Sequence, residues 1–142
     1  MHLDVKPSNI LLRNNGEAVL IDFGISKRYD DTGNQTSSTP IGISKGSAPL
    51  EQYKQGGVKT FSPGTDIYSL GATLFYLLTS QQPPEASDVN DEGLPALPTK
   101  ISPLIRKAIQ GAMQPRCKDR PQNINEFLTL LNEGIKPGLE NE

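Results

Sequence analysis

The sequence predicts a mainly α-helical fold with one small β-hairpin near the N-terminus, and two observations carry that prediction. Two short apolar runs, Ile10–Leu12 and Ala18–Ile21, flank an Asn-Asn-Gly turn at residues 14–16. The later stretches instead place apolar residues three and four positions apart, beginning with residues 65–79. At 142 residues, the chain has room for one domain or for part of a larger one.

The composition argues against several classes of function. A net charge of −2 argues against a basic surface, so we expect no nucleic-acid partner. No apolar run approaches the roughly 18 residues that span a bilayer, and the first residues show no basic-then-apolar export signal. Cys117 is the only cysteine, which excludes an internal disulfide and argues against a cysteine-based zinc site. We therefore expect a cytoplasmic protein without a membrane segment.

The predicted hairpin brings together the polar residues that lie at its two ends. Asn-Gly sequences tolerate the positive φ angles of a tight turn, so the two apolar runs are expected to pair as antiparallel strands. Asp4 and Asn9 precede the first strand, and Asp22 follows the second. Pairing of the strands therefore predicts one site that contains Asp4, Asn9 and Asp22.

The rest of the chain is predicted to be a long loop followed by helices. Residues 25–47 lack periodicity and are rich in Ser and Thr, and loops of this length in small domains are usually functional. A buried central helix is expected over residues 65–79, because apolar or small residues occupy all of its faces. Four prolines predict an irregular crossing segment over residues 81–100. Two more helices are expected, over residues 102–113 and over about residues 122–132.

Four polar residues around the hairpin have the chemistry that phosphoryl transfer to a hydroxyl group requires. A carboxylate orients the attacking hydroxyl and accepts its proton, which suits Asp4. A lysine two positions later, Lys6, suits contact with the transferred phosphoryl group. The amide oxygen of Asn9 and the carboxylate of Asp22 suit Mg²⁺, a hard cation that prefers oxygen ligands. His2 is expected to be a packed, hydrogen-bonded structural residue rather than a base.

The combination of these motifs resembles the protein serine/threonine kinase family. Residues 2–9 read His-Leu-Asp-Val-Lys-Pro-Ser-Asn, and Asp-Phe-Gly follows the hairpin at residues 22–24. The chain is most similar to bacterial members, and the resemblance covers the C-terminal lobe of the kinase domain from the catalytic loop onward. It implies a partial kinase domain over residues 1–132, without an N-terminal lobe, and a flexible tail over residues 133–142.

The resemblance implies a role for each polar residue of the site. Asp4 is implied to be the catalytic aspartate, Lys6 the residue that contacts the phosphates of ATP, and Asn9 and Asp22 the Mg²⁺ ligands. Ser44 aligns with the family threonine that contacts the catalytic aspartate. Lysine at position 6 is typical of family members that act on Ser or Thr. The implied reaction is transfer of the γ-phosphoryl group of ATP to a Ser or Thr hydroxyl of a protein substrate.

Further residues extend the resemblance beyond the catalytic loop. Residues 48–52, which read Ala-Pro-Leu-Glu-Gln, resemble the segment that closes the activation loop. The resemblance implies that Glu51 pairs with Arg120, and such a carboxylate–guanidinium pair would clamp the end of the loop to the lobe. It also implies that Asp66, which opens the central helix, accepts backbone N–H bonds from the catalytic loop.

The sequence departs from the family pattern in two respects. Leu3 stands where many kinases have an arginine that receives an activation-loop phosphate, so weak dependence on such phosphorylation is expected. The Gly-rich loop, strand lysine and helix glutamate that align ATP in the family have no counterpart in the sequence. The chain alone is therefore expected to bind ATP weakly, to require the N-terminal segment, and to expose an apolar strip beside helix 65–79. Met1 is expected to correspond to an internal methionine of a longer protein.

Two other functions fit part of the pattern. One is a non-catalytic interaction module, in which the loop and the exposed apolar strip of a kinase lobe bind a partner. The other is a small-molecule phosphotransferase, which shares the His-x-Asp motif, the asparagine and the metal-binding aspartate. Lys6, the Asp-Phe-Gly motif and the Ala-Pro-Leu-Glu segment disfavour the small-molecule enzyme.

Overall fold

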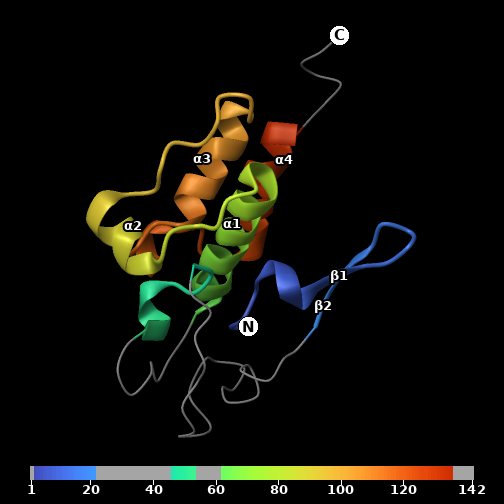
Figure 1. The fold of residues 1–142 in the computed structure, drawn as a ribbon, viewed down its shortest axis with the longest axis horizontal. Helices are drawn as coiled ribbons and strands as arrows, with labels where there is room; N and C mark the ends of the chain where they lie inside the picture. The colour runs from blue at the N-terminus through green and yellow to red at the C-terminus, as the bar shows by residue number, and fades with distance from the viewer. Residues whose placement is uncertain (1, 22–45, 54–61, 136–142) are drawn as a thin grey trace, which may run out of the picture.

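The computed structural model describes residues 2–21, 46–53 and 62–135 (Figure 1). These residues form four α-helices and a two-stranded hairpin, which confirms the predicted mainly helical fold. Most of the predicted loop over residues 25–47 lies outside the described residues. The elements in chain order are η1 (Pro7–Asn9), β1 (Ile10–Leu12), β2 (Ala18–Leu20), η3 (Leu50–Tyr53), α1 (Pro63–Thr79), α2 (Ala86–Glu92), α3 (Pro103–Ala112), η4 (Cys117–Asp119) and α4 (Ile124–Ile135), where η marks a 3₁₀ turn.

The hairpin forms where the Asn-Asn-Gly turn predicts it. Strands β1 and β2 pair antiparallel, with Leu11 opposite Val19 at the centre of the ladder. Gly16 adopts a positive φ of 88°, a conformation that glycine reaches without steric cost. Figure 1 shows the hairpin projecting from the helical part of the molecule, with its open end beside the N-terminus. The residues that precede β1 and follow β2 are therefore neighbours.

Helix α1 is the central element, as predicted, and it lies among the other helices in Figure 1. It starts at Pro63, whose fixed φ suits the first helical position, and it ends at Ser80 in a left-handed conformation. At Gly71 a Cβ atom would lie 2.8 Å from the Cβ of Ala112, so glycine permits α3 to pack closely against α1. The final turn differs from the prediction of a buried helix, because Leu77 is 60% exposed.

The core lies between α1, α3 and α4, with a contribution from the segment that precedes α3. Two adjoining clusters of buried side chains make it up: Tyr68, Ala72, Phe75, Ala86, Leu97, Ile101, Ile105, Ile109 and Met113 in one, and Ile67, Ala108, Ala112 and Phe127 in the other. Burial of this apolar surface is the main term that stabilises the helices. The core thus fixes α1, which carries the residues that contact the N-terminal loop.

Helices α2 and α4 differ from the sequence-based expectation. The segment over residues 81–100, expected to be irregular, contains the short helix α2, and the side chains of Ala86 and Val89 bury this helix against the core. Helix α4 begins at Ile124 because Asn123 caps it, accepting the N–H of Glu126 at 2.9 Å. It continues to Ile135, beyond the predicted end at residue 132. The predicted tail otherwise lies outside the described residues.

No helix within the described ranges has both the length and the apolar character needed to cross a membrane.

Candidate functional site

The N-terminal loop places three of the predicted site residues next to one another. Pro7 starts the turn η1, which curls the chain so that Asn9 returns toward Asp4. The Asn9 amide donates to the Asp4 carbonyl at 2.8 Å and to the Asp4 carboxylate at 3.1 Å. The Lys6 ammonium lies 3.7 Å from the same carboxylate. A carboxylate, an ammonium group and an amide therefore meet at one place, where Asp4 and Lys6 are partly exposed and Asn9 is buried.

The open end of the hairpin ties this loop to the chain that leads to Asp22. The N–H of Ile21 donates to the carbonyl of Asn9 at 2.9 Å. The His2 ring lies 2.8 Å from the Ile21 carbonyl through Nε2 and accepts the N–H of Asp4 at Nδ1. A carbonyl oxygen can only accept, so the Nε2–H donates to Ile21 while Nδ1 accepts from Asp4. His2 therefore occupies a buried structural position.

Asp22 and Ser44 lie outside the described residues, so the structure brings together only part of the predicted site. Asp22 directly follows Ile21, which is bonded to Asn9. Since Nδ2 of Asn9 faces Asp4, the amide oxygen is the Asn9 atom left to hold a cation, and it is the donor type that Mg²⁺ prefers. Within the described ranges, no group of three or more His, Cys, Asp or Glu side chains could hold a metal ion.

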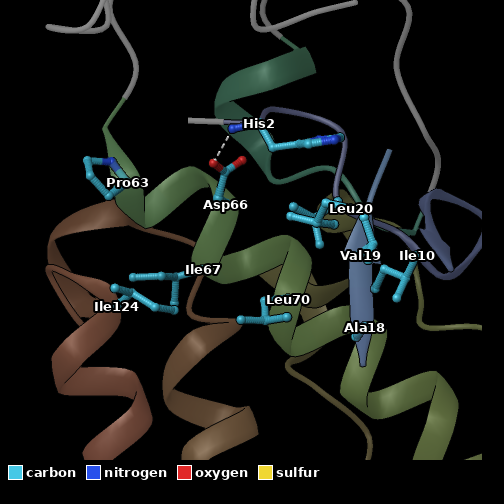
Figure 2. Close-up of a pocket in the computed structure, with 11 residues that line it drawn as sticks. His2, Ile10, Ala18, Val19, Leu20, Pro63, Asp66, Ile67, Leu70 and Ile124 are labelled. Atoms are coloured by element: carbon cyan, nitrogen blue, oxygen red, sulfur yellow. Dashed lines mark hydrogen bonds between the residues drawn. The ribbon is translucent and has the colours of Figure 1, made fainter. Parts of the chain in front are cut away.

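Asp66 joins the N-terminal loop to helix α1. Its carboxylate accepts the backbone N–H of His2 (Figure 2) and the backbone N–H of Leu3, the latter at 2.7 Å. Leu3 has a φ of 68°, a left-handed conformation that costs a residue with a Cβ roughly 1–2 kcal/mol. Its side chain is buried, at 1% exposure, so it cannot receive a phosphate group in the way an arginine would. The two bonds to Asp66 help to hold this unfavourable backbone in place.

A buried arginine anchors the segment of residues 46–53 to the helices. Arg120 donates to both carboxylate oxygens of Glu51, at 2.8 and 3.0 Å, and the hydroxyl of Thr65 donates to Glu51 at 2.8 Å. The guanidinium also donates to the carbonyls of Gln114, Gly64 and Pro115, at 2.7–3.0 Å. Its central carbon lies 4.9 Å from the ring centre of Tyr68. Arg120 is therefore saturated by contacts from several elements.

The pKa of the Glu51 carboxyl predicts a dependence of stability on pH. Burial raises this pKa, but the hydrogen bonds and the charge of Arg120, together with the Thr65 hydroxyl, outweigh burial and leave the pKa below its usual value. The folded state therefore binds this proton less readily than the unfolded chain does. The stabilisation by ionised Glu51 is complete above the unfolded pKa of about 4.3 and is lost as the pH falls through the lower folded pKa.

We expect Glu51→Gln to lose this pH-dependent stabilisation. Urea unfolding of both proteins between pH 6 and pH 3 measures it. The difference in unfolding free energy between the native protein and the variant should be largest near pH 6 and should shrink below about pH 4.3. A difference that stays constant over this range would show that the Glu51 charge does not contribute.

An apolar pocket of about 540 Å³ lies beside the loop, between β2 and α1 (Figure 2). Leu20 of β2 and Ile67 and Leu70 of α1 are among the residues that line it, and the Asp66 and His2 side chains border it. Ile124 of α4 lines it too and is 46% exposed. The described lining does not include Asp4, Lys6 or Asn9, so the pocket is distinct from the polar site. Its position agrees with the apolar strip expected beside this helix.

Sequence reasoning missed the roles of Thr65 and Gln52. Thr65 lies one position before Asp66 and bonds Glu51, while the Gln52 side chain donates to the Leu3 carbonyl at 3.0 Å. Thr65 precedes Asp66 and Gln52 follows Glu51 in the sequence. Threonine and glutamine are not residue types that by themselves indicate a contact with a distant part of the chain.

Comparisons with known proteins identify the family of this chain. A family described as "Protein kinase domain" matches residues 1–133. The chain is 37% identical over 95% of its length to serine/threonine-protein kinase PknA of Nostoc sp., and 33% identical over 94% to serine/threonine-protein kinase F of Synechocystis sp.. Serine/threonine-protein kinase D of Synechocystis sp. is 31% identical over the whole chain. The chain spans 25–30% of the length of these relatives.

Proposed function

This chain belongs to the protein kinase family, and we propose that it supplies the catalytic half of a serine/threonine protein kinase. In this role it transfers the γ-phosphoryl group of ATP to a Ser or Thr hydroxyl of a protein substrate. The observation that carries the proposal is the arrangement of Asp4, Lys6 and Asn9 on one loop, bonded through Ile21 to the end of the hairpin that leads to Asp22.

Each of these residues has a task that its contacts support. Asp4 orients the hydroxyl of the substrate and accepts its proton on a carboxylate oxygen, while the Asn9 amide fixes the rotation of that carboxylate. The Lys6 ammonium, 3.7 Å from Asp4, contacts the phosphates of ATP on the same side. Asn9 and Asp22 would hold Mg²⁺, which supplies charge neutralisation on the phosphate oxygens when bound. We also assign Ser44 a supporting contact with Asp4.

The apolar pocket supports a second part of the proposal, that a preceding kinase segment completes the site. An open apolar surface beside α1 is unfavourable in water unless another segment covers it, and Leu20 and Ile124 are both partly exposed there. The relatives are three to four times longer than the chain, so they have additional sequence to supply such a segment. ATP is the proposed donor, and it is available in the cytoplasm, where we propose that the protein acts.

Phosphoryl transfer measured for the chain alone and for the chain extended upstream in its gene tests the proposal. We expect Mg²⁺-dependent ATP binding and transfer to a Ser/Thr protein substrate in the extended form, and weak or undetectable binding by the chain alone. The apolar pocket gives one competing function, that of an interaction module. Absence of transfer in both forms, together with capture of a defined partner at the pocket, would favour that module instead.

A further inference from the structure

We propose that Gln52 is a positioning residue for the catalytic loop. Its side-chain amide holds the carbonyl group that directly precedes Asp4, and it thereby links the segment of residues 46–53 to the proposed catalytic aspartate. The inference deepens the proposed function and rests on it for the role of Asp4, but the contact itself is a property of the folded chain.

The Leu3–Asp4 peptide unit is held at both of its polar ends. Its carbonyl oxygen, on Leu3, accepts the Nε2–H of Gln52 at 3.0 Å. Its N–H, on Asp4, donates to Nδ1 of His2 at 3.1 Å. Because a peptide unit is planar, two bonds on opposite edges fix its rotation about the chain axis. Rotation of this peptide would move the Cβ atom of Asp4, and it would break at least one of these two bonds.

The backbone of Leu3, on the N-terminal side of this peptide, has an unfavourable conformation that must be stabilised by contacts. Leu3 adopts a left-handed φ of 68°, which is sterically unfavourable for leucine. Asp66 restrains the N–H of Leu3, but only Gln52 among the described residues bonds the Leu3 carbonyl. The bond from Asp66 does not prevent rotation of the Leu3–Asp4 peptide, because it holds the N–H of Leu3 and not its carbonyl. The bond from Gln52 to the carbonyl opposes this rotation.

Gln52 is itself fixed by its neighbours, so it can transmit position. Its backbone N–H donates to the Pro49 carbonyl at 3.0 Å, and the preceding residue, Glu51, is bonded by Arg120 and Thr65. Ser69 of α1 further binds the segment through the Ser47 carbonyl at 2.6 Å. The Gln52 side chain thus extends from an anchored backbone to the loop, and its donor group is held where the Leu3 carbonyl lies.

Gln52 is buried, and its burial is explained by the contact of its side-chain amide with the Leu3 carbonyl. The residue is 7% exposed, and its Oε1 atom has no hydrogen-bond partner within the described ranges. An apolar side chain of similar size would avoid the cost of burying that oxygen. A glutamine at this position is therefore explained by its N–H donor to Leu3.

The test compares Gln52→Met, which keeps the length and removes the donor, with Gln110→Met on the exposed face of α3. Amide hydrogen exchange of the 142-residue chain should be about tenfold faster at Asp4 in the Gln52 variant, the factor expected for loss of one ordinary hydrogen bond. Exchange in the core of α1 and α3 should change far less. In the upstream-extended protein, kcat should fall about tenfold while KM for ATP stays the same. Gln110→Met should alter none of these quantities.

Two outcomes overturn the inference. One is an Asp4 exchange rate that Gln52→Met leaves unchanged, and the other is faster exchange with an unchanged kcat. Gln52→Leu, which also lacks the donor and adds no charge, gives the same comparison if the methionine variant does not fold. Absence of transfer by the unmodified extended protein would instead count against the proposed function, and the exchange comparison would still decide whether Gln52 positions the loop.

Discussion

We expect Arg120→Met to lower the free energy of unfolding by about 3–5 kcal/mol, the cost typical of removing one partner of a buried ion pair. The Arg120 side chain is 0% exposed, and the Glu51 carboxylate it binds is largely shielded from water, at 17% exposure. Methionine fills much of the same volume but leaves that carboxylate without its cation. It also leaves the carbonyls of Gly64, Gln114 and Pro115 without their donor.

Urea unfolding of the chain measures this loss, and Arg13→Met is the matched control. Arg13 pairs with Glu17 at 3.0 Å, yet both side chains are more than half exposed. Exposed pairs of this kind contribute about 0–1 kcal/mol, so the control should unfold close to the native protein. Similar losses for the two variants would contradict the assignment of Arg120 as the anchor of residues 46–53.

The elements that could be predicted from the sequence are those with a strong local signal. The Asn-Asn-Gly turn fixes the hairpin, and the periodicity of α1 and α3 extends over enough turns to identify each helix. Helix α2 escaped prediction because it has seven residues and two buried apolar side chains, too few to establish a period. The start of α4 was displaced by two residues because the cap at Asn123 lies inside the stretch that appeared helical.

The candidate site was predictable only in part, for a physical reason. Within the loop, Asp4, Lys6 and Asn9 are separated by a few residues, so local geometry brings them together. The contacts of Asp66 with Leu3 and of Glu51 with Arg120 join residues more than 60 positions apart, and only the family resemblance suggested them. The contact between Gln52 and Leu3 uses a backbone carbonyl, which every residue type has, so the sequence carries no mark of it.

Replacement of Asp4 by asparagine is expected to have the largest effect on activity. Asparagine keeps the shape of the side chain and an oxygen that can accept from Asn9, so the loop should remain folded. The neutral amide cannot take the proton of an attacking hydroxyl, and it removes the charge beside Lys6. Loss of a positioned general base lowers the rate of transfer by about 10²–10⁴-fold. Binding of Mg²⁺ and ATP should change much less, because Asn9, Asp22 and Lys6 remain.

Asp88→Asn is the matched control, since Asp88 is an exposed carboxylate on α2, away from the N-terminal loop. The most direct test of the proposed function is therefore the rate of phosphoryl transfer to a Ser/Thr protein substrate by the upstream-extended protein, measured for the native sequence and for both variants. We predict transfer that depends on Mg²⁺, persists in Asp88→Asn and falls by at least about 10²-fold in Asp4→Asn. Equal transfer by the native protein and Asp4→Asn would contradict the assignment of Asp4 as the catalytic aspartate.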